Sequence, residues 1–292
     1  MFRKLAYNLV VVISLSQVGC SDDEEPVVGP DDNQQQSGVI RVPADQPTIQ
    51  AAIVAADVGD SIIVAAGTYR GGGNREIVFG GKSVTLVSES GPSATVIDCQ
   101  GTEADWHFAF DITSPGDSAV VIDGFTIINT YHTQGTAMNF RSVSPTIKNC
   151  LFVDNAAYIS GGAIRCKAAS PSFINCAFVG SSAPAGAVAY LLAASSPSFE
   201  KCIIVSATGG EVIDCSDDLS QPVFVCCDIY GNEGGDWIEC LADQLGVGGN
   251  ISADPLFCDA AGGDFRLQTG SPCSEANSGC GERMGAMEVG CQ

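Results

Sequence analysis

The chain has 292 residues, of which 45% are hydrophobic and 16% charged, so it can bury a core and does not have the composition of a disordered protein. Thirteen Lys and Arg stand against 34 Asp and Glu, which gives a formal net charge of −21. This acidity excludes the basic surface that nucleic acid requires, and it argues equally against adsorption to anionic membranes.

The first 20 residues are typical of an export signal. MFRK is basic, and the apolar run LAYNLVVVISLS is too short to span a bilayer as a helix. SQVGC resembles the cleavage site of a bacterial lipoprotein signal and implies lipid attachment at Cys20, although Gln17 stands where that pattern has Leu. Ordinary signal cleavage is the alternative. Residues 21–38 hold acidic runs, two prolines and a Gln run, and predict a flexible tether.

Residues 45–60 predict a helix that covers the N-terminal end of the fold. Its apolar face follows the spacing i, i+3, i+4, i+7 and consists of Ile49, Ala52, Ile53 and Ala56. SIIVAAGTY at 61–69 then predicts the first strand.

One short phrase recurs at a fixed period in the middle of the chain. SPTIKNCLF, SPSFINCAF and SPSFEKCII begin 26 residues apart, at Ser144, Ser170 and Ser196, and a weaker copy begins at Gln221. Such a period indicates a solenoid or a propeller, but a propeller blade needs about 40 residues, and these copies hold short β-rich pieces without a helical stripe. The sequence therefore predicts a parallel β-helix of about nine coils over residues 40–270.

Three columns of like residues define the expected register. The column expected to fill the core is Ile97, Ile122, Ile147, Phe173, Phe199 and Phe224. The second column is Phe125, Cys150, Cys176, Cys202 and Cys227, and the third consists of glycines near 135, 161, 185 and 209. Stacked cysteines are close enough for disulfides, but buried cysteine also packs as a small hydrophobe, and stacked free thiols are the favoured interpretation.

The residue after each member of the core column is expected to point outward. Asp98, Asp123 and Lys148 would then form one row, with the two carboxylates about 5 Å apart. Such a pair raises one pKa and has the separation found in retaining glycosidases, so these three are the candidate catalytic residues. A surface charge ladder in which Lys148 screens Asp123 is the favoured interpretation, because long insertions are scarce.

A second acidic set follows in the chain. It begins with Asp214, Asp217 and Asp218 and continues with the candidate calcium ligands Asp228, Asn232, Glu233 and Asp236. DIYGNEGGD does not match an EF-hand loop, so a solvated loop is favoured over calcium, and no cofactor is expected. Trp106 and Trp237 could stack on sugar rings, although single aromatic residues are more often packed.

The chain has 14 cysteines, a density that is unusual in the reducing cytosol and permissible in a protein that leaves it. The last four are expected to form one or two disulfides in an irregular C-terminal cap, with the connectivity open: Cys258, Cys273, Cys280 and Cys291.

A family resemblance covers residues 39–292. VPADQPTIQAAIVAADVGDSIIVAAGTY resembles the opening of the pectin-lyase-like right-handed parallel β-helix superfamily. GGAIRCKAASPSFINCAF resembles the repeats of bacterial surface proteins, including the polymorphic outer-membrane proteins with their FxxN motif and their GGA motif followed by Ile, Leu or Val. The resemblance implies an all-β domain at 39–292, a single-stranded right-handed parallel β-helix with an N-terminal capping helix and a Cys-rich C-terminal cap.

The superfamily contains esterases, lyases, hydrolases and non-enzymes, so activity depends on individual motifs. GTYR at 67–70 is similar to the GxYxE motif of pectin methylesterases, but Gly71 replaces the Glu, and the motifs of polygalacturonases and pectate lyases are absent.

We therefore expect an exported, lipid-anchored protein of the outer membrane or cell surface, which contacts the membrane through its lipid alone. It would act as a non-catalytic binding or structural module for a polysaccharide, the cell wall or a surface protein. The alternatives are a secreted or periplasmic location and a carbohydrate-active enzyme that uses Asp98, Asp123 and Lys148. No sequence feature predicts an oligomeric state.

Overall fold

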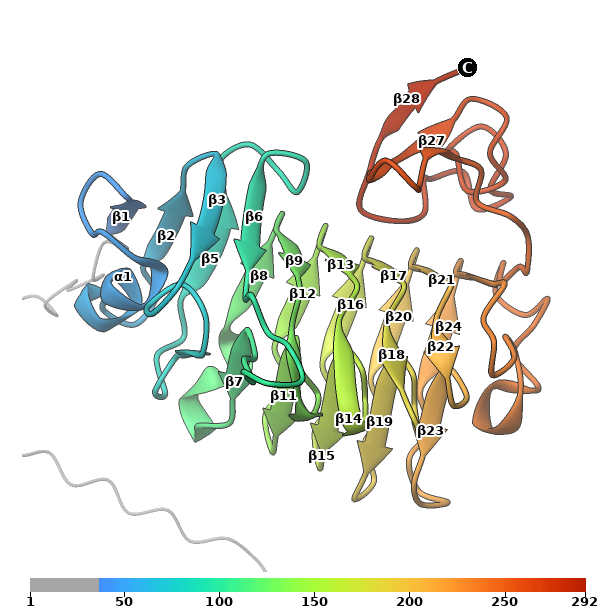
Figure 1. Cartoon of the computed structure of the whole chain (residues 1–292), viewed down its shortest axis with the longest axis horizontal. Coiled ribbons are helices and arrows are strands. Elements are labelled where there is room, and N and C mark those ends of the chain that lie inside the picture. Colours follow the sequence, from blue (N-terminus) through green and yellow to red (C-terminus); the bar gives the residue numbers. More distant parts are fainter. Residues whose placement is uncertain (1–36) are drawn as a thin grey trace, which may run out of the picture. The chain divides into compact units, whose positions relative to one another are not determined.

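Short parallel strands, stacked turn upon turn, make up the part of the chain that the structure describes. The computed structural model describes residues 37–292, which form a solenoid of about ten turns (Figure 1). The prediction of an all-β parallel solenoid is confirmed. The predicted signal, Cys20 and residues 21–36 of the predicted tether lie outside the described residues.

Three long sheets run along the solenoid. Sheet A consists of β1 (Val39–Val42), β2 (Ser61–Val64), β5 (Thr85–Ser88), β8 (Val121–Asp123), β12 (Thr146–Lys148), β16 (Ser172–Ile174), β20 (Ser198–Glu200) and β24 (Val223–Val225). Sheet B consists of β3 (Gly67–Arg70), β6 (Thr95–Asp98), β9 (Thr126–Ile128), β13 (Leu151–Val153), β17 (Ala177–Val179), β21 (Ile203–Val205) and β25 (Asp228–Tyr230). Sheet C consists of β4 (Ile77–Val78), β7 (Phe110–Ile112), β11 (Met138–Arg141), β15 (Ile164–Lys167), β19 (Ala189–Leu192) and β23 (Ile213–Cys215).

A fourth, shorter sheet lies between sheets B and C in each of four turns. Sheet D consists of β10 (Tyr131–Gln134), β14 (Ala156–Ser160), β18 (Ser182–Ala183) and β22 (Thr208–Gly209). Two 3₁₀ helices, η1 (Pro115–Ala119) and η2 (Glu239–Leu241), interrupt the strands.

A helix is present where the N-terminal cover was predicted, but it is shorter than residues 45–60, and Ala56 is its C-cap. It is α1 (Ile49–Ala55), whose N-cap Thr48 accepts a hydrogen bond from the amide of Ala51 (3.2 Å). Its predicted apolar face is buried against β1 and β2. Lys82 Nζ donates to three carbonyl oxygens at the C-terminal end of the helix, which satisfies groups that have no partner within the helix.

Like residues stack in the core, as the repeats predict. In sheet A the inward column, in register and almost completely buried, is Ile62, Leu86, Ile122, Ile147, Phe173, Phe199 and Phe224. The rings of Phe199 and Phe224 stack with centroids 4.5 Å apart. The predicted place of Ile97 in this column is wrong, because Ile97 lies in sheet B and pairs with Ile127. Residues 99–109 and η1 lengthen the solenoid turn that precedes Ile122. Counting back one repeat period from Ile122 therefore reaches Ile97 in sheet B, whereas the neighbour of Ile122 in sheet A is Leu86.

The predicted column of stacked free thiols is also confirmed. Cys150, Cys176, Cys202 and Cys227 are fully buried and form no disulfide. Burial raises the pKa of the Cys150 and Cys202 thiols well above the ordinary value, so these side chains pack as small hydrophobic groups and are not nucleophiles.

The C-terminal cap folds back onto the outer face of sheet B (Figure 1). It contains β26 (Phe257–Asp259), β27 (Asp264–Gln268) and β28 (Val289–Cys291), which form a sheet of their own. The outward residues that it covers are Leu151, Ala177, Val179, Ile203 and Val205. Strands β13, β17 and β21 are therefore apolar on both faces because both faces are buried.

Three disulfides staple the C-terminal part, and they correct the predicted set. Cys258 pairs with Cys291 within the cap, whereas Cys280 pairs with Cys226 at the end of sheet A. Cys273 forms no disulfide: its thiol is buried between the cap and sheet B and donates to Asp228 Oδ2 (3.2 Å). The third disulfide, Cys215–Cys240, was not predicted.

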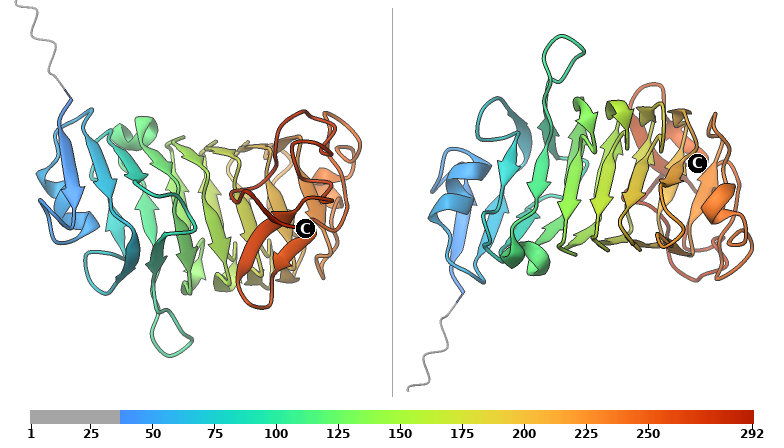
Figure 2. Two further views of the ribbon diagram at one scale, coloured as in Figure 1. Left: turned by 90° about the horizontal axis from the view of Figure 1, so that it is seen from above. Right: turned by 90° about the horizontal axis from the view of Figure 1, so that it is seen from below.

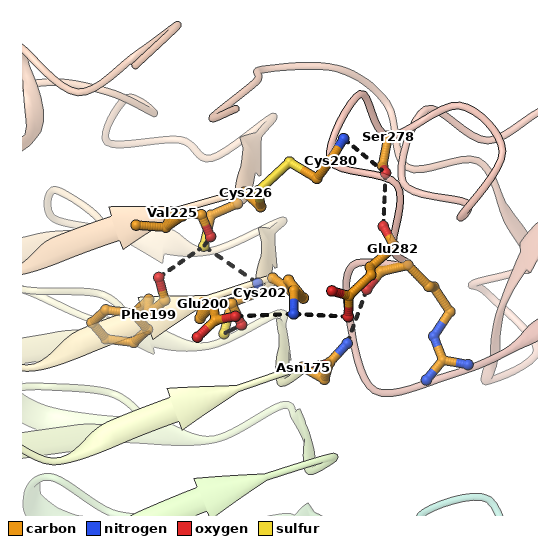
Figure 3. A network of polar contacts seen from close by, with 12 residues as sticks. Asn175, Phe199, Glu200, Cys202, Val225, Cys226, Ser278, Cys280 and Glu282 are labelled. Carbon is orange, nitrogen blue, oxygen red and sulfur yellow. Dashed lines mark hydrogen bonds and ion pairs between the residues drawn. A yellow bond between two sulfur atoms is a disulfide. The ribbon is translucent and has the colours of Figure 1, made fainter. Parts of the chain in front are cut away.

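One column of turns between sheets A and B holds the cap in place. Asn175, Lys201 and Cys226 have the same left-handed backbone conformation in successive turns. The Asn175 amide donates to the carbonyl of Arg283 (2.9 Å), Lys201 Nζ contacts Glu282 Oε2 (2.8 Å), and Cys226 forms its disulfide with the cap (Figure 3).

No helix within residues 37–292 has the length and apolar character needed to cross a membrane.

Candidate functional site

The predicted row of Asp98, Asp123 and Lys148 is divided between two sheets. Asp98 lies in β6 of sheet B and pairs with Ile128, whereas Asp123 lies in β8 of sheet A beside Lys148. The prediction that the two carboxylates are neighbours is therefore wrong, and it fails for the same reason as the place of Ile97. The expected contact between Asp123 and Lys148 is present, at 3.2 Å.

Each of these carboxylates has partners of its own. Asp98 is 6% exposed and accepts hydrogen bonds from Arg70 Nε (2.8 Å) and Asn129 Nδ2 (2.9 Å). Burial alone would raise the pKa of Asp98, but these hydrogen bonds hold it below its usual range. Asp123 also accepts from Asn149 Nδ2 (2.7 Å). These contacts are those of structural ion pairs.

The candidate calcium ligands do not converge on one point. Asp228 is fully buried under the cap, Asn232 Nδ2 donates to Asp236 (2.9 Å), and Glu233 accepts from the amide of Gly209 (3.1 Å). Among residues 37–292 no three His, Cys, Asp or Glu side chains gather as a metal site. Asp214, Asp217 and Asp218 instead line a wide acidic hollow of about 1100 Å³ together with Glu211, Glu239 and Asp243.

The two tryptophans occupy different environments. Trp237 packs edge-on against Phe224 (ring centroids 5.7 Å apart) and donates its Nε1 hydrogen to the carbonyl of Ile251. Trp106 is 44% exposed and lies on the long loop 99–109 between β6 and β7. Figure 2 shows this loop, in teal-green, projecting from the solenoid.

The loop is tied to sheet D at its base. The backbones of His107 and Tyr131 exchange two hydrogen bonds (2.8 and 2.9 Å), and the amide of Gly101 donates to the carbonyl of Asn129 (2.7 Å). His107 Nδ1 also lies 2.7 Å from Glu76 Oε1. Although the loop projects, these contacts fix the backbone on both sides of Trp106.

Trp106 belongs to a group of rings that we call the aromatic shelf: Trp106, Tyr131, His132 and Tyr158. The ring of Trp106 stacks on that of Tyr158 (6.3 Å, 29°) and meets those of Tyr131 (6.4 Å) and His132 (5.9 Å) at larger angles. Tyr158 is 62% exposed. The shelf thus presents aromatic faces to solvent over β10 and β14, where the solenoid carries no cap.

A polar groove lies beside the aromatic shelf, between sheets C and D. This sheet C groove encloses about 320 Å³ and is lined by Phe108, Asp111, His132, Thr133, Gln134, Gly135, Asn139, Arg141 and Arg165. Parallel register places the outward side chains of β7, β11 and β15 in line across it. Asn139 Nδ2 donates to Asp111 Oδ1 (2.6 Å), and Arg165 Nη1 donates to Asn139 Oδ1 (3.1 Å).

The backbone of Gly135 in the groove lies close against Arg165 of β15, and this approach requires a glycine. Its φ of 58° lies in the left-handed region, and a Cβ at this position would collide with the Cβ and backbone of Arg165. The glycine column that the sequence shows thus begins at a position where the two walls touch.

His132 joins the aromatic shelf to the groove. Burial lowers the pKa of His132, while the carboxylates of Glu76 and Asp111 act in the opposite direction. The imidazole is therefore neutral at neutral pH, and it is available as a hydrogen-bond acceptor or donor for a ligand.

Of the residues of the shelf and the groove, only Trp106 is a candidate from the sequence. Two signals could have pointed to the others. The first is that Asp111, Asn139 and Arg165 are spaced by nearly one repeat period. The second is that the stretch 99–109 interrupts the repeats and contains one of the two histidines. No protein-family model matches the chain, and no curated protein sequence matches it.

Proposed function

We propose that this protein is an exported, lipid-anchored surface module that binds a carbohydrate without transforming it, and that the aromatic shelf is its binding face. One observation carries the proposal: the rings of Trp106, Tyr131 and Tyr158 are clustered and held on an exposed face. Large aromatic side chains that stay exposed together mark binding surfaces more often than single exposed residues do.

The chemistry of the site suits a sugar. The CH faces of pyranose rings pack on aromatic faces, and their hydroxyl groups need donors and acceptors nearby. The groove beside the shelf supplies both, from Gln134, Thr133 and Asn139. The loop that carries Trp106 is anchored at its base, so little conformational freedom is lost on binding.

The export part of the proposal rests on separate features. The basic start, the apolar run and Cys20 match a lipoprotein signal. Three disulfides between residues 215 and 291 fit an oxidising compartment outside the cytosol. The parallel solenoid is consistent with membership of the pectin-lyase-like superfamily, which the opening segment 42–69 suggests. A cell-surface or outer-membrane location follows from the anchor, with a secreted or periplasmic location as the alternative.

A glycan array probed with the full-length protein, followed by titration of the best ligand, tests the proposal. Trp106→Ala should weaken binding by at least about tenfold, because truncating an anchoring aromatic residue typically costs about 2 kcal/mol or more and tenfold corresponds to about 1.4 kcal/mol. Tyr230→Ala is the matched control, since Tyr230 is also exposed but lies in β25, away from the shelf. Equal binding by the wild type and Trp106→Ala would remove the shelf from the account.

A carbohydrate-active enzyme is the second candidate, and His132 favours it. A neutral imidazole beside Asp111 and two guanidinium groups is an arrangement that can move a proton. The assay incubates the protein with neutral and acidic polysaccharides and looks for new reducing ends, unsaturated products or released methanol. Turnover that disappears in His132→Gln would replace the non-catalytic proposal with this one.

A further inference from the structure

Three cations without a carboxylate partner lie on the outward face of β11 and β15. Arg141 and Lys167 are register partners on the two strands, and Arg165 lies two residues before Lys167. Within residues 37–292, none of the three has a carboxylate oxygen within 4.0 Å. The cations that do have such a partner are Arg41, Arg70, His107, Lys148, Lys201 and Arg266. In a chain of net charge −21, an unpaired basic cluster is unexpected.

Arg165 is held in place inside the groove. Its Nη1 donates a hydrogen bond to Asn139 Oδ1, and Gly135 packs against the Cβ of Arg165. Its Nε is buried and has no hydrogen-bond partner in the described part of the chain. Burial, together with repulsion from Arg141, lowers the pKa of Arg165, although a guanidinium stays charged at neutral pH.

The surrounding carboxylates do not neutralise this cluster. Asp111 is the only acidic residue that lines the sheet C groove, and its Oδ1 accepts a hydrogen bond from Asn139. Glu76, farther along, contacts His107. The groove therefore carries more positive than negative charge, and the guanidinium groups of Arg141 and Arg165 repel each other.

We propose that the ligand of the sheet C groove carries an oxyanion, either a carboxylate or a sulfate ester, on the sugar that packs on the aromatic shelf. A guanidinium presents a planar fork of donors that matches such a group, and an anion between Arg141 and Arg165 relieves their repulsion. Lys167 adds long-range attraction at the edge of the groove. This inference rests on the proposed carbohydrate function and names the class of carbohydrate.

Calorimetric titration of the full-length protein in mild detergent tests the inference with four probes. These are hexagalacturonate, a sulfated carrageenan hexasaccharide, neutral cellohexaose and sodium sulfate. An anionic hexasaccharide should bind more tightly than cellohexaose, and its affinity should fall as NaCl rises from 50 to 500 mM. Which of the two anionic probes binds more tightly distinguishes the carboxylate from the sulfate ester.

Two arginine variants and one control distinguish the loss of an arginine in the groove from the loss of a positive charge elsewhere on the protein. Arg165→Gln should weaken binding of the preferred anionic probe about 10- to 100-fold, the loss of one charge-assisted hydrogen bond. Arg141→Gln, at an exposed position where folding is not at risk, should weaken it in the same direction. Arg283→Gln removes the same charge from the cap and should leave binding unchanged.

The possible failures are distinguishable. Binding of cellohexaose as tight as that of the anionic probes, lost in Trp106→Ala but kept in Arg165→Gln, overturns this inference and leaves the carbohydrate proposal standing. Sulfate binding that depends on Arg165, with no hexasaccharide bound, supports the anion site and overturns the carbohydrate proposal. Absence of binding by all four probes to the folded protein overturns both.

Discussion

Replacing Asp228 by Asn should stabilise the protein at neutral pH and change little at pH 4. Asp228 occupies an outward position of β25, next to Ile203 in register, where the cap covers sheet B. It is fully buried, and its carboxylate accepts hydrogen bonds from the amide of Ala253 (3.0 Å) and the thiol of Cys273 (3.2 Å). The substitution keeps the size of the side chain and an acceptor for the Ala253 amide while removing the charge.

The pKa of Asp228 gives the magnitude. Burial raises this pKa from 3.8 to about 6, and the nearby carboxylates of Asp236 and Asp254 act in the same direction. Because the folded state binds the proton more tightly than the unfolded state, the contribution of this group to stability is fully present below pH 3.8. It is lost as the pH rises through about 6. At about 1.4 kcal/mol per pH unit, ionised Asp228 costs about 3 kcal/mol at pH 7.

Guanidinium-induced unfolding of the wild type and Asp228→Asn at pH 4, 5, 6, 7 and 8 measures this cost. The free energy of unfolding of the variant should exceed that of the wild type by up to about 3 kcal/mol at pH 7, and the two should converge towards pH 4. Asp243→Asn, at an exposed position, is the control and should follow the wild type at every pH. A difference between Asp228→Asn and the wild type that is constant with pH would mean that ionisation of Asp228 does not destabilise the folded state.

Three further predictions concern the core, the cap and the proposed lipid anchor. Phe173→Ala should lower the free energy of unfolding by about 3–5 kcal/mol and Ile174→Ala by much less, because only Phe173 fills the core; equal losses in denaturant titrations would mean that the faces are assigned the wrong way round. Replacing both Cys226 and Cys280 by Ser opens a disulfide between residues 54 apart and should cost about 4 kcal/mol; limited proteolysis should then cut the cap before the solenoid, and unchanged resistance of the cap would contradict its attachment through this bond. Cys20→Ala should abolish partition into a detergent phase, and membrane association that survives this change would remove the lipoprotein proposal.

The regular part of the solenoid could be predicted because its period is uninterrupted. From Ile122 to Phe224 each turn has nearly the same length, so equal spacing in the sequence becomes equal position in sheet A. Ile97 and Asp98 were misplaced because the turn before Ile122 contains an insertion, and a count along the chain cannot show where the added residues leave the repeat.

The cap and the groove could not be predicted from the period, for different physical reasons. The cap contains no repeat, so neither its place on sheet B nor the disulfide between Cys226 and Cys280 follows from spacing. The groove depends on side chains of different types, such as Asp111 and Arg165, which share a face only because three strands are in register. A row of unlike residues leaves no repeating pattern in the sequence.

The proposed binding face can be tested most directly through the fluorescence of Trp106. The chain contains two tryptophans, and Trp237 is packed under the end of the solenoid. Titrating the full-length protein with the best carbohydrate from the array should give a saturable change in tryptophan emission. This change should disappear in Trp106→Phe, where Trp237 is the remaining tryptophan. A saturable change that persists unaltered in Trp106→Phe would contradict the proposed binding face and place the ligand elsewhere on the molecule.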